Sequence, residues 1–314
     1  MTRLPASADP PVIAARPSTA TLLLATLRPQ QWTKNLFLFA GLLFGGHLFE
    51  AAAVGRAIGG FAIFCALAGV VYVFNDLADR EADQRHPLKR TRPIASGQLP
   101  SGVAAMAGAV LAVGGCIGAV LLSHSFALVA VAYLALLLLY SAGLKHVVIV
   151  DVLTIAAGFV LRAVAGAAVV NAPISHWLLI CTTLLALFLA LSKRRHELVL
   201  LGEGAIAHRR ILEEYSPYLL DQMIAVVTAS TLIAYTLYTI SPDTVQRLGT
   251  DRLGLTIPFV LYGIFRYLYL VHQRRGGGSP AAMLLTDRPL LACVALWAIS
   301  VALVLYSPEL LKGY

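Results

Sequence analysis

Apolar runs of about 20 residues recur along the whole chain, which is the length an α-helix needs to cross a bilayer. No other feature of the sequence restricts the fold as strongly. The runs are continuous and do not alternate between apolar and polar residues, which argues against a transmembrane β-barrel. Composition agrees, since 59% of the 314 residues are hydrophobic, 13% are charged and the mean hydropathy is +0.79. The sequence therefore predicts an all-α, polytopic membrane protein.

Nine spans can be placed, and three long polar loops separate some of them, at 75–101, 193–218 and 273–288. The first residues contain four prolines and no apolar core. We therefore expect a flexible tail over 1–20, not a signal peptide, followed by a single transmembrane domain over 21–314. The predicted spans are 34–50, 55–74, 102–122, 126–141, 147–170, 175–192, 219–240, 255–272 and 289–307.

The distribution of lysine and arginine predicts the orientation of these spans. With the N-terminus inside, eighteen cations lie on the inner side and four on the outer side, while Arg162 and Arg266 fall within spans. Because cytoplasmic loops carry the excess of cations, we expect a bacterial inner-membrane protein with a cytoplasmic N-terminus and an external C-terminus. The net charge of +8 then reflects topology, and no nucleic-acid partner is expected. Four isolated cysteines in apolar runs predict buried thiols.

A polar stretch, 75–93, directly follows the second predicted span. Within it, Asp76, Asp79 and Asp83 recur at helical spacing, so an extended helix end would place all three carboxylates on one face. Like charges repel, and a divalent cation that bridges to a phosphate is the most direct compensation. Mg²⁺ is usually held by one or two carboxylates together with substrate phosphates. On the charges alone, a solvated loop of mixed charge explains the stretch equally well.

Further polar groups border other spans at the same predicted membrane face. Lys34 either snorkels from the first span or binds a phosphate. Tyr140, Lys145 and His146 precede Asp151, which lies just inside a span, where an acid is costly unless it is paired or metal-bound. One interpretation assigns Asp151 to a metal and Lys145 to a phosphate. The other is a buried structural carboxylate beside a helix-end lysine.

Three more cations complete the candidate set. Arg162 lies eleven residues after Asp151 and on the same helical face, and a buried arginine needs an anionic partner, either a carboxylate or a lipid phosphate. Lys193 and Arg194 close the sixth span, where they either set the topology or bind a terminal phosphate. Because charged groups gather at one membrane face, the pattern favours an enzyme that joins a water-soluble substrate to a lipid over a channel or transporter.

The motif Asn75-Asp76-x-x-Asp79-x-x-x-Asp83, at the end of the second of nine spans, resembles the UbiA prenyltransferase superfamily. The similarity covers nearly the whole chain beyond the N-terminal tail. It implies nine helices around a cavity that opens laterally to lipid. It also implies that aspartate-rich motifs on the cytoplasmic side hold Mg²⁺ against a diphosphate.

Three further motifs are similar to the decaprenyl-phosphate phosphoribosyltransferase branch of this superfamily. The motif that contains Lys145, His146 and Asp151 departs from ordinary aromatic prenyltransferases, which usually carry a second aspartate-rich motif in that region. Its two extra cations suit phosphoribosyl pyrophosphate, which carries a 5-phosphate besides its diphosphate, and a lipid acceptor that brings a third phosphate group. The motifs are Arg28-Pro29-x-Gln31-Trp32-x-Lys34-Asn35, Lys89-Arg90-x-Arg92-Pro93-Ile94-Ala95-x-Gly97 and Tyr140-x-x-x-Leu144-Lys145-His146-x-x-x-x-Asp151.

This resemblance implies transfer of 5-phosphoribosyl from phosphoribosyl pyrophosphate to a polyprenyl (decaprenyl) phosphate, with release of pyrophosphate, in the biosynthesis of cell-wall arabinan. Mg²⁺ is expected on Asp76, Asp79 and Asp83, and Asp151 is expected to hold a second metal or the ribose hydroxyls. These four acids and Lys145 are the predicted catalytic residues. The predicted substrate-binding residues are Lys34, Asn75, Tyr140, Lys145, His146, Arg162, Lys193 and Arg194.

Two alternatives stay open at this point. The first is a UbiA-type prenyltransferase that uses a prenyl diphosphate and an aromatic or other small acceptor. The second is a transporter or lipid-binding scaffold that performs no chemistry. Lipid length, oligomeric state and a lid role for 193–218 do not follow from the sequence.

Overall fold

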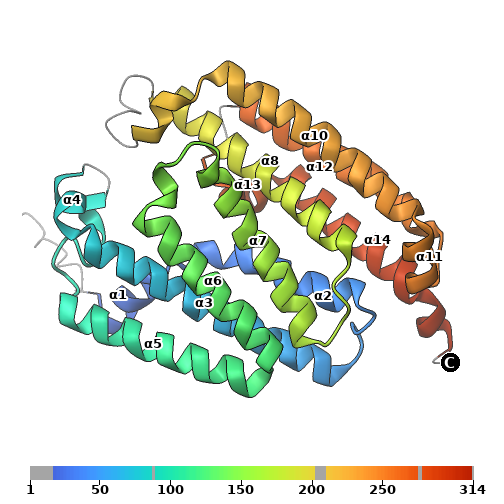
Figure 1. The fold of residues 1–314 in the computed structure, drawn as a ribbon, viewed down its shortest axis with the longest axis horizontal. Helices are drawn as coiled ribbons and strands as arrows, with labels where there is room; N and C mark the ends of the chain where they lie inside the picture. The colour runs from blue at the N-terminus through green and yellow to red at the C-terminus, as the bar shows by residue number, and fades with distance from the viewer. Residues whose placement is uncertain (1–16, 87–88, 202–209, 275–277, 313–314) are drawn as a thin grey trace, which may run out of the picture.

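The computed structural model describes residues 17–86, 89–201, 210–274 and 278–312, and these residues form an all-α bundle, as predicted (Figure 1). In chain order the elements, with η for 3₁₀ helices, are α1 (Thr19–Thr26), η1 (Pro29–Leu38), α2 (Phe39–Phe44), α3 (Ala51–Ala78), α4 (Arg80–Arg85), η2 (Lys89–Thr91), α5 (Ser101–Leu122), α6 (His124–Ala142), η3 (Leu144–His146), α7 (Val150–Val169), α8 (His176–Leu201), η4 (Arg210–Glu214), α10 (Pro217–Ile240), α11 (Pro242–Leu248), η5 (Arg252–Thr256), α12 (Ile257–Gln273), α13 (Pro280–Thr286) and α14 (Arg288–Lys312).

Eight helices within the described ranges are long and apolar enough to cross a membrane. They correspond to the second to ninth predicted spans. Local sequence signals define several of their ends. Ser123 caps α6 by accepting a hydrogen bond from the backbone N–H of Phe126, and Ser216 caps α10 in the same way, with Pro217 in the first turn.

The continuous helix predicted over 34–50 is the exception. Its residues instead form the end of the ten-residue 3₁₀ helix η1 and the six-residue helix α2. Arg28, with φ 52°, turns the chain immediately before Pro29, and Gly46, with φ 84°, follows the end of α2. These two residues with positive φ lie on either side of the segment formed by η1 and α2. Hydropathy alone does not predict such backbone conformations.

Close backbone packing also shapes the α2 segment. A Cβ atom on Gly41 would overlap the backbone of Gly166 in α7, and a Cβ atom on Gly166 would overlap the backbone of Leu38. The two glycines therefore allow η1 and α2 to lie directly against α7, as small residues do at helix contacts in membranes.

Helices occupy part of each predicted loop, including α13 within 273–288, and the end of the predicted tail. The polar loop expected to begin at residue 75 begins later, because α3 continues to Ala78 and α4 follows at once. The loop expected over 193–218 is also shorter at its start, since α8 continues to Leu201; its residues 202–209 lie outside the described part of the chain. Most of the predicted tail also lies outside it, although α1 begins within the tail, at Thr19.

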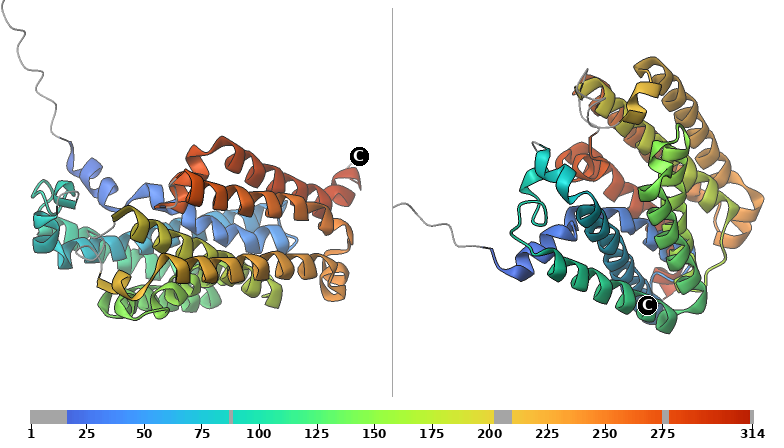
Figure 2. Two further views of the ribbon diagram at one scale, coloured as in Figure 1. Left: turned by 90° about the horizontal axis from the view of Figure 1, so that it is seen from above. Right: turned by 60° about the vertical axis from the view of Figure 1, so that its left-hand side comes forward.

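α7 lies at the centre of the bundle. It packs against α2 and α6 from the N-terminal half and against α8 from the C-terminal half, and Figure 2 shows the long helices side by side along one common direction. α5 and α6 lie outside this centre and expose large apolar side chains, including Leu121 and Leu128 at 81% and 74%. Such surfaces suit a lipid solvent. α4 and α11 lie at opposite ends of the bundle (Figure 1).

Candidate functional site

Charged side chains gather at one end of the bundle. Apart from His47–Glu50, every ion pair found among the described residues lies where α3, α8 and α12 end and where α7, α10 and α14 begin. We call this the charged end. Two clusters at this end contain buried aspartates, and the remaining ion pairs join Asp221 to Arg195 and His272, and Asp287 to Arg266.

The first cluster joins Asp76, at the end of α3, to Asp83 in α4. Both side chains are 2% exposed. Arg92 Nη1 lies 3.0 Å from Asp76 Oδ1 and 2.6 Å from Asp83 Oδ2. Arg28 Nη2 donates to the same Asp76 oxygen over 2.6 Å, and Lys89 Nζ lies 3.7 Å from Asp83. Thus the like charges of the two carboxylates are compensated by cations of this chain.

Asp79 is separated from the other two aspartates. The helix does not continue through the motif, because α3 ends at Ala78 and Asp79 forms the junction with α4 at φ −92°, ψ 9°. This break leaves Asp79 exposed, while Asp76 and Asp83 turn toward Arg92. The expectation of three carboxylates on one face of an extended helix is therefore wrong, because Asp76 and Asp83 meet across the break between α3 and α4 and Asp79 does not join them.

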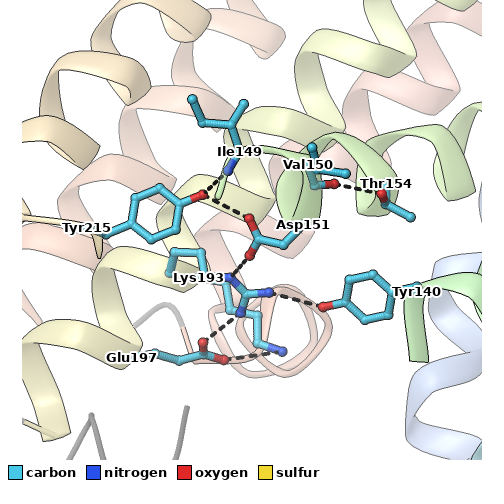
Figure 3. A network of polar contacts seen from close by, with 9 residues as sticks. Tyr140, Ile149, Val150, Asp151, Thr154, Lys193, Glu197 and Tyr215 are labelled. Atoms are coloured by element: carbon cyan, nitrogen blue, oxygen red, sulfur yellow. Dashed lines mark hydrogen bonds and ion pairs between the residues drawn. The ribbon is translucent and has the colours of Figure 1, made fainter. Parts of the chain in front are cut away.

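The second cluster surrounds Asp151, in the first turn of α7, and Figure 3 shows its contacts. Arg194 Nε donates to Asp151 Oδ2 over 2.8 Å, and the Tyr215 hydroxyl donates to Oδ1 over 2.8 Å. Asp151 is fully buried, and the Arg194 side chain is 1% exposed. Both carboxylate oxygens are thus occupied by donors from distant parts of the chain.

Tyr215 also holds the chain at the start of α7. Its hydroxyl accepts a hydrogen bond from the backbone N–H of Ile149 over 2.7 Å. Ile149 has φ 67°, a rare conformation for a β-branched residue. Burial raises the pKa of Tyr215 to about 12, so the phenol keeps the proton that it donates to Asp151 at neutral pH.

Arg194 connects this cluster to its surroundings. Its Nη1 lies 2.7 Å from Glu197, and its Nη2 donates to the Tyr140 hydroxyl over 3.2 Å. Glu197 in turn lies 3.6 Å from Lys193 Nζ (Figure 3). Arg194 is therefore a hub between the buried Asp151 and two neighbouring polar side chains.

Arg162 lies deeper in α7 and is 6% exposed. Its Nε donates to Asn35 Oδ1 over 2.7 Å, and its Nη2 donates to the Tyr133 hydroxyl over 2.6 Å. The guanidinium also lies 4.7 Å from the centre of the Tyr133 ring. All these partners are uncharged, so the positive charge of Arg162 remains available to an anion.

A cavity of about 950 Å³ runs between the helices. Asn75 and Lys193 line it at the charged end, and Arg247 of α11 lines it at the opposite end. Its described lining residues include four cations and no aspartate or glutamate. Aromatic and aliphatic side chains form most of the remaining wall. The cavity therefore suits an amphipathic ligand that carries negative charge.

The structure brings together only part of the predicted site. The predicted residues that line the cavity are Lys34, Asn75, Tyr140, Arg162 and Lys193. Asp76, Asp83, Asp151 and Arg194 are not among the lining residues and lie in the two clusters, and Asp79 is exposed at the junction of α3 and α4. Lys145 and His146, in η3, are not among the lining residues; Lys145 is half-buried and His146 is exposed.

Three side chains that donate hydrogen bonds to the buried aspartates were absent from the predicted site, although two of them lie in motifs noted above. Arg28 and Arg92 pair with Asp76 across 48 and 16 residues of sequence, and Tyr215 meets Asp151 across 64. The Arg28-Pro29 and Arg92-Pro93 dipeptides were available as signals for the two arginines. Nothing in the local sequence indicated Tyr215.

The first cluster fits a magnesium ion that is shared with a substrate phosphate. Two carboxylates converge on one cationic nitrogen of Arg92, and Mg²⁺ is commonly held by one or two carboxylates plus phosphate oxygens. Within the described ranges, no group of three or more histidines, cysteines or acids could hold a metal through protein ligands alone. Asp151 fits less well, because Arg194 and Tyr215 occupy both of its oxygens.

The fold and the site together define a multi-pass membrane protein with an internal, positively charged cavity. The chain belongs to the UbiA prenyltransferase family, whose model matches residues 17–286, and is thus a UbiA-family transferase. The resemblance inferred from the sequence motifs is confirmed.

Known proteins similar to this chain include both relatives and solved structures. The decaprenyl-phosphate phosphoribosyltransferase of Mycobacterium tuberculosis is 34% identical over 281 residues, which cover 88% of this chain and 91% of that protein. The nodulation protein NoeC of Azorhizobium caulinodans is 34% identical over 173 residues, 54% of this chain and 55% of that one. A UbiA homologue from Archaeoglobus fulgidus, bound to GPP and Mg²⁺, has a TM-score of 0.69 at 18% identity, covering 90% of this chain and 99% of that chain.

Proposed function

We propose that the protein transfers 5-phosphoribosyl from phosphoribosyl pyrophosphate to a polyprenyl phosphate such as decaprenyl phosphate, and releases pyrophosphate. The observation that carries this proposal is the charge of the cavity, whose described lining includes Lys34, Arg162 and Lys193 but no acid. The donor and acceptor bring three phosphate-containing groups between them. Several cations at one end of a cavity stabilise that much negative charge.

The apolar part of the cavity supports a lipid substrate. Phe37 and Phe44 line it from the N-terminal half, and Trp177 and Trp297 line it from the C-terminal half. A polyprenyl chain gains free energy when it is buried against such side chains. The phosphate at the end of that chain would then meet the cations at the charged end. The lateral opening of the cavity to lipid remains part of this proposal.

The relatives support the same reaction. The mycobacterial protein described above is named a decaprenyl-phosphate phosphoribosyltransferase, and the matched region extends over about nine-tenths of both chains. By this similarity, the product would serve arabinan biosynthesis in the cell wall, as the motifs imply.

Magnesium fits this mechanism at Asp76 and Asp83. When bound there, Mg²⁺ would neutralise charge on the leaving diphosphate. Asn75 lines the cavity beside this cluster and can orient a phosphate oxygen. We retain Asp79 as a predicted contributor, although it is exposed. For Asp151 we propose a role in positioning, since its oxygens are already engaged.

The cavity cations would bind and orient the two substrates. Lys34 and Lys193 would hold phosphate groups at the charged end, and Arg162 would supply charge deeper in the cavity, beside Tyr133 and Asn35. The C1 centre becomes oxocarbenium-like as the diphosphate departs, as in other glycosyl transfers. The acceptor phosphate is already ionised at neutral pH, so no side chain needs to act as general base. Lys145 and His146 would meet substrate outside the cavity.

We also propose that the charged end faces the cytoplasm. This orientation follows the excess of cations on that side and gives a water-soluble donor direct access. The segment of η1 and α2 would provide a ninth crossing. Ten residues of 3₁₀ helix and six of α-helix extend about 29 Å, close to the hydrocarbon thickness of about 30 Å. The segment begins beside Arg28, which pairs with Asp76 near the C-terminal end of α3, and it leads into the N-terminal end of α3. It therefore runs from one end of α3 to the other.

Radiolabelled phosphoribosyl pyrophosphate tests the proposed reaction. Purified protein in nanodiscs with Mg²⁺ and decaprenyl phosphate should move label from the aqueous phase into the lipid phase, and EDTA should abolish the transfer. A labelled prenyl diphosphate, offered with an aromatic acceptor, is the matched comparison. Incorporation from the prenyl diphosphate alone would contradict our proposal and favour the prenyltransferase alternative. Absence of transfer from either donor would favour a non-catalytic protein.

A further inference from the structure

The segment formed by η4 and Tyr215 contacts the buried centre of the charged end, although its residues do not line the cavity. Ile211, Leu212 and Tyr215 in this segment are 4%, 1% and 4% exposed. Ile211 and Tyr215 belong to one hydrophobic cluster with Phe188 of α8 and Val152 of α7. The segment is therefore anchored to the two helices that carry the Asp151–Arg194 pair.

Tyr215 is the polar member of this anchor. Its single hydroxyl is used in both directions, because it donates to Asp151 Oδ1 and accepts from the backbone N–H of Ile149 (Figure 3). A phenol offers one proton for donation and can accept at its oxygen. Loss of the hydroxyl would leave a buried carboxylate oxygen without its donor and the backbone N–H of Ile149 without its acceptor.

The effect of Tyr215 can reach the cavity through Arg194. This guanidinium binds Asp151 with Nε and uses its other two nitrogens for Glu197 and Tyr140. Because a guanidinium is planar and rigid, its position at Asp151 also fixes the direction of its remaining donors. Tyr140 lines the cavity directly, and Glu197 holds Lys193, which also lines it.

We propose that Tyr215 is a positioning residue that acts on the cavity through the buried pair of Asp151 and Arg194. It does not contact substrate. Its hydroxyl keeps the carboxylate oriented toward Arg194, and Arg194 keeps Tyr140 and Lys193 where they can meet a phosphate group. This role rests on the proposed function, since it assumes that the charged end of the cavity binds the diphosphate part of a donor.

Inorganic pyrophosphate is the probe for this role, because it is the product of phosphoribosyl transfer and of prenyl transfer alike. We would measure its affinity in the presence of Mg²⁺ for the full-length protein, for Tyr215→Phe and for Tyr218→Phe. Tyr218 is three residues away and 74% exposed, so it provides a matched control. We expect Tyr215→Phe to weaken binding about tenfold and Tyr218→Phe to change it less than twofold.

A second variant separates positioning from backbone support. If Tyr215 acted only by holding the left-handed Ile149, then adding Ile149→Gly to Tyr215→Phe would restore affinity, since glycine adopts positive φ without strain. Our proposal predicts no restoration. It also predicts that Tyr215→Phe adds little to the loss caused by Asp151→Asn, because the two residues act in series.

Two results would overturn the proposal. One is equal pyrophosphate affinity in Tyr215→Phe and Tyr218→Phe, and the other is restoration by Ile149→Gly. If Tyr215→Phe does not fold, Asp151→Asn is compared with Tyr218→Phe instead. Equal pyrophosphate affinity of these two variants would show that Asp151 does not transmit an effect to the cavity. None of these affinity measurements depends on which donor the enzyme uses. Their outcome can therefore be distinguished from a failure of the phosphoribosyl transfer assay.

Discussion

Two aspartate clusters lie at the same end of the bundle but differ in how tightly they are enclosed. At Asp76 and Asp83 the arginine partners remain 31% and 29% exposed. At Asp151 the partner Arg194 is 1% exposed. A partly hydrated arginine can exchange its carboxylate for another ligand, whereas a fully enclosed pair cannot separate without a large cost in desolvation. We therefore interpret the first cluster as exchangeable and the second as a fixed support.

The fixed cluster should dominate stability. Arg194→Met removes one partner of a fully buried pair and leaves the Asp151 carboxylate uncompensated, which we expect to cost about 3–5 kcal/mol of unfolding free energy. Thermal or denaturant unfolding in detergent measures the change. The neighbouring Arg195→Met is the control, because Arg195 pairs with the 37% exposed Asp221 and should lose about 1 kcal/mol or less. Equal losses in the two variants would contradict the contrast between enclosed and exposed pairs.

The exchangeable cluster should dominate activity. Asp76→Asn keeps the size of the side chain and its contact with Arg28 but removes the charge that a metal requires, so we expect transfer to fall about 100-fold. Steady-state transfer of label into lipid, with elution volume as a check on folding, measures the effect. Asp79→Asn is the matched control and should lower activity less than about threefold, because Asp79 is exposed at the junction between α3 and α4. Similar losses of activity in both variants would contradict this distinction and support a metal site formed by all three aspartates.

The smallest effect is expected at Arg92, whose Nη1 lies between the two carboxylates. Arg92→Gln removes a competing cation, so the Mg²⁺ concentration that gives half-maximal activity should fall about threefold. Titration of activity with Mg²⁺ at saturating substrates checks this shift. A higher requirement for Mg²⁺ would show that Arg92 helps to assemble the metal site and does not compete with the metal.

Most spans could be predicted from the sequence, because long apolar runs leave few alternatives in a membrane. The prediction of 102–122 differs by one residue from α5, Ser101–Leu122. Over 34–50 the single helix expected from hydropathy is divided between η1 and α2, and α2 lies directly against α7 at Gly41. The span predicted over 175–192 also ends earlier than α8, which continues to Leu201. Arg194 looks like a loop residue in sequence, yet Asp151, 43 residues away, makes it a buried helical one.

The site was less predictable than the fold. Residue type and spacing identified the aspartates and Lys34, Arg162 and Lys193, because charges beside apolar runs are conspicuous. The partner of each aspartate depends on tertiary contacts, so the sequence did not separate Asp76 and Asp83 from Asp79. For the same reason, the sequence was compatible both with a metal ligand and with a structural carboxylate at Asp151. The structure provides the pair with Arg194.

A structure of the protein with Mn²⁺ and pyrophosphate would test the contrast between the two clusters most directly, since the anomalous scattering of manganese locates the metal. We predict a manganese peak between Asp76 and Asp83, with Arg92 displaced and Asp151 still bound to Arg194 and Tyr215. A manganese peak on Asp151, with Arg194 moved away from it, would contradict our assignment of an exchangeable and a fixed cluster.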